Sequence, residues 1–175
     1  MPESDLSVLI KAARAAGEVA SQFDGPSAKL WYKPNEAGPV TEADLAVNDV
    51  LFEQLMQARP QYGWLSEETE DSSARQQASR VFIIDPIDGT RSFINGDKTW
   101  AHSLAIAEHG QITAAVVFLP MLNKLYAAAR GQGASLNDAV LSASDCEDIF
   151  TAKVLTTRAN IDPKHWNGPV PDLQR

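Results

Sequence analysis

One ten-residue segment, from Val81 to Thr90, constrains this chain more than any other part of its sequence. It opens with four consecutive apolar residues, which is typical of a strand buried on both faces of a sheet. The run ends at Asp85-Pro86, and a second carboxylate follows at Asp88. We expect a tight turn through the proline and a short helix that starts after this second carboxylate. The segment therefore predicts a buried strand whose end presents two acidic side chains at one place.

The two residues that follow are Gly89 and Thr90. Backbone N–H groups in the first turn of a helix have no acceptor within the helix, so they suit a phosphate oxygen. Asp85 and Asp88 would repel that phosphate, and a divalent cation between them would remove the conflict. Carboxylate and carbonyl oxygens are the ligands that Mg²⁺ prefers. The competing interpretation is structural, because Asp is also a favoured helix cap and turn residue.

The rest of the chain predicts helices that cover a sheet. Apolar residues three and four apart indicate amphipathic helices from residue 6 to about 23 and from Thr41 to Pro60. The second helix should bury one apolar face formed by Leu45, Leu51, Phe52, Leu55 and Met56. Strand-like runs follow at 62–65, 101–108, 112–119 and 124–129, and the short glycine-containing link at 109–111 is typical of a hairpin. We expect an α+β fold, with helices layered on a largely antiparallel sheet.

Composition narrows the classes of partner. Fifteen Lys and Arg residues against 23 Asp and Glu residues give a formal net charge of −8, which argues against a nucleic acid or an anionic membrane as the main partner. The lone cysteine, Cys146, excludes an intrachain disulfide and a thiolate metal site. The apolar runs fall short of the about 20 residues that a spanning helix needs, and residues 1–5 lack the pattern of a signal peptide. We expect a soluble, cytoplasmic protein.

The segment from Asp85 to Phe93 resembles the signature of the inositol monophosphatase family of Mg²⁺-dependent, lithium-sensitive phosphatases. That family shares its fold with fructose-1,6-bisphosphatases and bisphosphate nucleotidases. Two further segments resemble the family in the same order, namely residues 64–69, where Ser66 stands in a position that is usually Gly, and residues 40–44. The resemblance covers residues 6–137, so it implies that most of the chain has the family's fold.

The resemblance also implies a role for each acidic residue of these segments. Glu67, Asp85 and the carbonyl group of Ile87 would hold one magnesium ion, and Asp85 with Asp88 would contribute to a second. The neighbouring Glu68 is expected to be a solvated loop charge, and its alternative role is to support a metal ligand from behind. The three histidines show no ligand spacing, and no role is assigned to them.

The remaining implied roles concern water and phosphate. Asp44 and Thr90 would activate the attacking water, while Asp88 and the backbone amides of Gly89 and Thr90 would bind substrate. Asp44 also lies three residues after a threonine, so its alternative role is to complete a helix cap. Lys33 is either a loop gate over the site or a surface lysine.

The implied function is the hydrolysis of a small phosphorylated metabolite, such as inositol monophosphate or a related polyol or sugar phosphate. A 3′(2′),5′-bisphosphate nucleotidase, a histidinol-phosphatase and an inactive metal-binding fragment are the alternatives. Family members are considerably longer, so we expect residues 1–150 to form the family's N-terminal domain and residues 151–175 to begin a missing second half or to form a tail. The intact enzyme is expected to be a homodimer, and this chain to bind one magnesium ion weakly and to hydrolyse esters poorly.

Overall fold

The computed structural model describes residues 3–33, 38–148, 151–153 and 162–168. The chain divides into two compact units, Met1–Leu141 and Ser142–Arg175. In the second unit, the described residues include a 3₁₀ turn at Pro163–His165, and the rest of the predicted tail lies mostly outside the described residues. In the described part of the chain, the helices are too short or too polar to cross a membrane.

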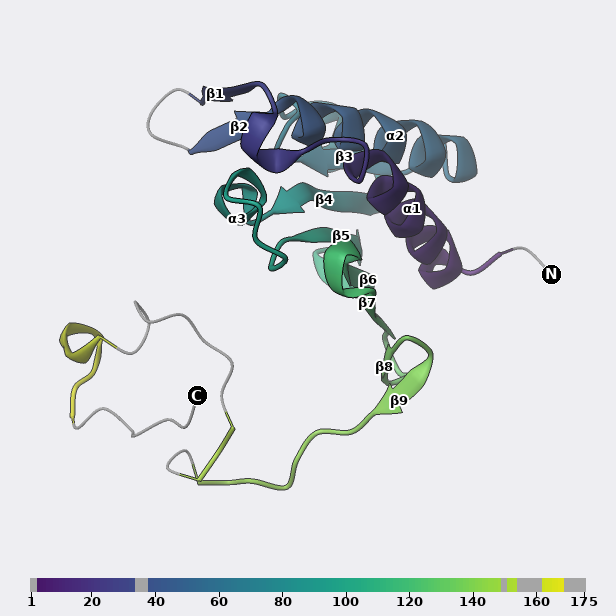
Figure 1. Ribbon diagram of the computed structural model, residues 1–175. Helices are drawn as coiled ribbons and strands as arrows, with labels where there is room; N and C mark the ends of the chain where they lie inside the picture. Colours follow the sequence, from purple (N-terminus) through teal and green to yellow (C-terminus); the bar gives the residue numbers. More distant parts are fainter. Residues whose placement is uncertain (1–2, 34–37, 149–150, 154–161, 169–175) are drawn as a thin grey trace. The chain divides into compact units, whose positions relative to one another are not determined.

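The first unit has the predicted α+β architecture (Figure 1). Its helices are α1 (Asp5–Ala20), α2 (Glu42–Ala58) and the short α3 (Thr90–Ile94). The seven-stranded sheet follows chain order: β3 (Gly63–Ser66), β4 (Arg80–Asp88), β5 (Ala101–Glu108), β6 (Gln111–Leu119), β7 (Lys124–Ala129), β8 (Ala134–Leu136) and β9 (Ala139–Leu141). Only the β3–β4 pair is parallel among the pairs of this sheet. A separate hairpin joins β1 (Leu30–Tyr32) to β2 (Pro39–Thr41).

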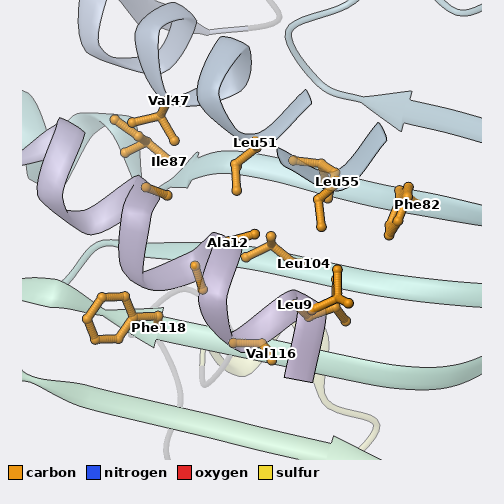
Figure 2. Close-up of a cluster of buried hydrophobic side chains, with 14 of the residues drawn as sticks. Leu9, Ala12, Val47, Leu51, Leu55, Phe82, Ile87, Leu104, Val116 and Phe118 are labelled. Carbon is orange, nitrogen blue, oxygen red and sulfur yellow. The ribbon is translucent and has the colours of Figure 1, made fainter. Parts of the chain in front are cut away.

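The core lies between the two long helices and one face of the sheet. Figure 2 shows the side chains of both helices pointing toward those of β4, β5 and β6. The residues that meet there are fully or almost fully buried: Leu9, Ala12, Val47, Leu51, Leu55, Phe82, Ile87, Leu104, Val116 and Phe118. Burying a side chain of this size stabilises the fold by roughly 2 kcal/mol, so this contact fixes how the helices sit on the sheet.

The predicted inner face of α2 was partly wrong. Leu51 and Leu55 are fully buried, but Leu45 is 38% exposed and Phe52 is 46% exposed. The helix turns a stripe of positions three and four apart toward the sheet, and this stripe includes Asp44, so the neighbours of its members point outward. The exposed phenylalanine packs edge-on against the Trp64 ring, with centroids 5.1 Å apart.

The strand that carries the acidic motif is longer than the apolar run predicted. β4 continues through Pro86 to Asp88, and α3 begins only at Thr90. Gly89 caps this helix with a left-handed backbone (φ 92°), a conformation that suits glycine because it has no Cβ. The chain therefore leaves the sheet at the glycine. The predicted tight turn through Pro86 was wrong, whereas the helix starts after Asp88 as predicted.

Candidate metal and phosphate site

The C-terminal end of β4 lies beside α3, and α3 contacts β2 (Figure 1). Asp44, in the first turn of α2, is 1% exposed and reaches this end of the sheet. Its Oδ2 accepts hydrogen bonds from the backbone N–H of Thr41 (2.8 Å) and from the Thr41 hydroxyl (2.6 Å). The capping interpretation of Asp44 is therefore confirmed, but it uses only one oxygen of the carboxyl group.

The other oxygen of Asp44 faces the acidic motif. The Thr90 hydroxyl lies 3.3 Å from Asp44 Oδ1 and 3.1 Å from the Ile87 carbonyl oxygen. A hydroxyl has one proton, so it can donate to only one of these acceptors at a time. Burial raises the pKa of Asp44, although hydrogen bonds from Thr41 and Thr90 oppose the rise. The structure thus brings together the two residues predicted to activate water.

A polar network holds the end of β3 against α2. The Ser66 hydroxyl donates to Asn48 Oδ1 (2.7 Å), and both residues are buried. Asn48 Nδ2 donates to the hydroxyl of Thr69 (3.3 Å), which directly follows the acidic pair Glu67 and Glu68 in the chain. Because Ser66 directly precedes Glu67, this network fixes the backbone from which that carboxylate projects.

Lys33 comes from the end of the β1 strand and reaches the acidic pair after β3. Its ammonium group lies 3.0 Å from Glu67 Oε1 and 2.7 Å from Glu68 Oε1. Burial lowers the pKa of Lys33, but hydrogen bonds and charges from the two glutamates outweigh it, and the pKa is raised. The prediction that Glu68 is a solvated loop charge was wrong, because its side chain is only 6% exposed. An ion pair 35 residues apart in the chain makes this burial possible.

Asp85 carries a strongly perturbed carboxyl group. Its pKa is raised to about 7, first by burial and then by the negative charges of Glu67 and Asp88. A carboxyl group shifts this far upward where it is buried and where other negative charges are near. The end of β4 thus concentrates negative charge, as the sequence predicted.

These carboxylates interact, but they do not form a ready ligand set. Among the described residues, no group of three His, Cys, Asp or Glu side chains is arranged to hold a metal ion. The Glu67 carboxylate accepts a hydrogen bond from Lys33 instead. The chemistry still fits a hard divalent cation, because the donors are oxygens and the raised pKa of Asp85 marks negative charge that a cation would relieve. The ligand set of Glu67, Asp85, Ile87 and Asp88 stays a prediction.

Sequence reasoning missed three residues that shape this end of the sheet. Glu68 and Asn48 are ordinary polar residues in the sequence, and only their contacts across the fold reveal their burial. His102 was assigned no role, yet it is fully buried and its Nδ1 lies 2.5 Å from the Pro86 carbonyl oxygen. Their signal in the sequence was weak, because no short-range spacing links any of them to the acidic motif.

The sequence of the chain is similar to those of known proteins. The sequence profile of the inositol monophosphatase family matches residues 1–168. An inositol-1-monophosphatase of Rhizobium meliloti (strain 1021) is 40% identical over 134 residues, which are 76% of this chain and 50% of that protein. The Nus factor SuhB of Escherichia coli (strain K12) is 34% identical over an alignment of 174 positions, which covers 93% of this chain and 65% of that protein.

The fold agrees as well. The crystal structure of the extragenic suppressor protein suhB from Bartonella henselae matches with a TM-score of 0.73 and 32% identity, over 80% of this chain and 54% of that one. This chain thus spans about half the length of the inositol-1-monophosphatases it matches. The chain belongs to the inositol monophosphatase family.

Proposed function

We propose that this chain carries the metal-binding and water-activating part of a magnesium-dependent phosphomonoesterase. The substrate is a small phosphorylated metabolite, either inositol monophosphate or a related polyol or sugar phosphate. The observation that carries the proposal is the contact of Thr90 with Asp44 and with the Ile87 carbonyl, next to the crowded charge of Asp85. A structural cap alone would need neither the threonine contact nor the unbalanced carboxylates.

In this proposal the protein positions a water molecule for in-line attack on phosphorus. The Thr90 hydroxyl donates to Asp44 Oδ1 and accepts from the water, so the proton of the water passes toward the carboxylate. The raised pKa of Asp44 makes it a better proton acceptor than an ordinary aspartate. The water oxygen forms the new bond to phosphorus and the ester P–O bond breaks. The leaving alkoxide takes a proton from solvent, and Asp44 returns the proton that it accepted to solvent.

Magnesium, held by Glu67, Asp85, Asp88 and the Ile87 carbonyl, would supply acidification of the water and stabilisation of the departing oxygen. The backbone amides of Gly89 and Thr90 are the proposed donors to the phosphate. α3 has only five residues, so these two N–H groups, more than a helix dipole, are the source of the attraction.

Two variants test the water-activating pair. Thr90→Val keeps the shape of the side chain but removes the hydroxyl, and Asp44→Asn removes the negative charge. Each should lower Mg²⁺-dependent phosphate release by about 10²- to 10⁴-fold, the usual contribution of a general base. Asp49→Asn, which changes an exposed carboxylate on the same helix, is the matched control and should leave the rate unchanged. Wild-type rates in the two test variants would overturn the proposal.

The substrate is tested with a panel of inositol monophosphates, sugar phosphates, a 3′(2′),5′-bisphosphate nucleotide and histidinol phosphate. We expect the first two classes to be hydrolysed faster, with inhibition by lithium. Preference for the nucleotide or for histidinol phosphate would assign the chain to one of the alternative activities. A chain that binds Mg²⁺ and releases no phosphate from any ester would be the inactive metal-binding fragment.

We also propose that residues 1–150 form the domain described above and that residues 151–175 lie outside it, as the beginning of a second half or as a tail. The first compact unit ends at Leu141, which supports a boundary shortly before residue 150. Limited proteolysis should leave a resistant fragment that contains the whole seven-stranded sheet. Early cleavage within the sheet would contradict it.

A further inference from the structure

The pairing of β4 with β5 changes register within the acidic motif. Asp85 pairs with Ser103 and Asp88 pairs with Ala101, so the two residues between the aspartates lie opposite His102 alone. This is the arrangement of a β-bulge, in which backbone groups of the longer strand lose their regular partners. One of those residues is a proline, which has no backbone N–H to contribute.

His102 supplies a partner for the bulge. Its Nδ1 lies 2.5 Å from the Pro86 carbonyl oxygen. A carbonyl oxygen only accepts, so Nδ1 carries the proton and Nε2 has a free lone pair. The ring is fully buried between Trp100 and Phe118, with centroids 5.5 Å and 6.2 Å away. Burial lowers the pKa of His102 to about 4, which keeps the ring neutral at neutral pH.

A histidine is energetically unfavourable at this core position. Within the described residues, Nε2 is the one buried side-chain nitrogen or oxygen without a hydrogen-bond partner. An apolar side chain between Trp100 and Phe118 would avoid that cost, but it would leave the Pro86 carbonyl without this donor. The hydrogen bond to the bulge is thus the property that distinguishes His102 from an apolar residue of similar size.

We infer that His102 is a positioning residue for the site: its Nδ1–H holds the bulge that sets the Ile87 carbonyl and the two flanking aspartates in place. The inference rests on the proposed function, because it concerns the same ligands. Pro86 is bonded to each of Asp85 and Ile87, so a shift of its peptide group would move both. The Ile87 carbonyl also accepts a hydrogen bond from the Thr90 hydroxyl (3.1 Å). A shift of the bulge would therefore also move Thr90, one of the two water-activating residues.

The test compares two replacements of the histidine. His102→Asn places an amide N–H near the former Nδ1, whereas His102→Phe fills the space without a donor. We expect the phenylalanine variant to bind Mg²⁺ about 10-fold more weakly, as when an outer hydrogen-bond partner of a metal ligand is lost. The asparagine variant should stay within about 3-fold of the wild type, because it retains the donor. Calorimetric titration of the purified chain with MgCl₂ measures both.

A matched variant separates positioning from general loss of packing. Leu104→Ala removes a buried side chain from the same strand, and Leu104 is 1% exposed. It should lower the melting temperature at least as much as His102→Phe while leaving Mg²⁺ affinity unchanged. Equal loss of affinity in the two variants, or unchanged affinity in His102→Phe, would overturn the inference.

Two readouts are independent of metal and of hydrolysis. Imidazole ¹⁵N shifts of the wild type should show the proton on Nδ1, and the opposite tautomer would overturn the inference even if His102→Phe does not fold. Amide hydrogen exchange from Ile87 to Thr90 should accelerate about 10-fold in His102→Phe and recover in His102→Asn. If the wild type binds no Mg²⁺, the proposed function fails, and these exchange rates still decide whether His102 holds the bulge.

Discussion

The two ends of β4 carry acidic side chains in opposite electrostatic settings. At the Arg80 end, Asp5 contacts Arg59 (3.0 Å), Arg80 (3.2 Å) and the Tyr62 hydroxyl (3.0 Å). Arg80 also contacts Glu108 at 2.9 Å, so each carboxylate there meets an arginine. The pKa of Arg80 is raised, first by its hydrogen bond to Tyr62 and then by Glu108.

The other end of the strand has more negative charge than positive charge. Asp85, Asp88, Glu67 and Glu68 gather there, and in the part of the chain that the structure describes only Lys33 forms an ion pair with any of them. Burial is the largest cause of the raised pKa of Asp85, and the negative charges of Glu67 and Asp88 add to it. Acidic residues alone therefore do not identify a metal site, whereas acidic residues without enough internal cations indicate one.

The largest expected effect is the difference in Mg²⁺ affinity between variants at the two ends of β4. Asp85→Asn should weaken Mg²⁺ binding by about 100-fold or more, because it removes a charged ligand. Asp5→Asn should leave the affinity unchanged, since Asp5 already has arginine partners. Calorimetric titration of both variants measures this difference. A similar loss in both variants would mean that the acidic ends are not functionally distinct.

The second prediction concerns stability at the balanced end. Asp5→Asn should lower the free energy of unfolding by about 2 kcal/mol, because Asp5 is partly buried and hydrogen-bonded to two arginines and a tyrosine. Urea denaturation in a chelating buffer gives the value. Asp49→Asn, at an exposed position without such contacts among the described interactions, is the control and should change it little. An Asp5→Asn variant as stable as the wild type would show that this network contributes nothing.

At the Asp85 end of β4, replacing the carboxylate should raise the free energy of unfolding instead of lowering it. The pKa of Asp85 is about 7 in the folded state, against an ordinary value of 3.8 for an aspartate in an unfolded chain, so the folded state binds more protons between these values. Ionised Asp85 therefore costs stability progressively as the pH rises through this window. Asp85→Asn removes that cost, and it should stabilise the metal-free chain by about 1–2 kcal/mol above pH 7, after allowance for solvent screening.

The measurement is the stability difference between Asp85→Asn and the wild type at each pH. His102 acts in the other direction, because its pKa of about 4 in the folded state makes stability rise with pH between this value and 6.5. Both proteins contain His102, so the difference cancels its contribution. A difference that is flat from pH 4 to pH 8 would contradict the assigned charge imbalance.

The smallest expected effect concerns Lys33, which forms ion pairs at the acidic end of β4. Lys33→Gln removes a positive charge that lies 3.0 Å from Glu67, so Mg²⁺ should bind about 3-fold more tightly. The cost should be lower stability, because Glu68 loses its partner while its side chain is 6% exposed. The same titration measures the affinity, with Lys11→Gln, on the exposed face of α1, as the control. Weaker Mg²⁺ binding in Lys33→Gln would show that Lys33 supports the metal site and does not compete with it.

Local patterns in the sequence predicted much of the fold. The third strand of the meander was predicted at 124–129, as observed for β7, and the hairpin of β5 and β6 was predicted within a residue. Both are largely apolar runs bounded by turn residues, so neighbouring positions determine them. The same holds for Asp44 and Thr41, whose three-residue spacing predicted the observed cap.

Contacts between distant segments were not predictable in this way. Lys33 meets Glu68 across 35 positions of the chain, and no periodicity connects them. Phe52 points outward because its ring packs against Trp64, which belongs to β3. This contact depends on how α2 lies on the sheet. His102 faces Pro86 only because the register of two strands shifts between Asp85 and Asp88.

The most direct test is to locate a bound cation in crystals of the chain grown with Mn²⁺, using its anomalous scattering. We expect an ion at the end of β4, with oxygen atoms of Glu67, Asp85 and Asp88 and the Ile87 carbonyl among its ligands. A fully occupied ion bound elsewhere, with the Glu67 carboxylate still on Lys33, would contradict this expectation.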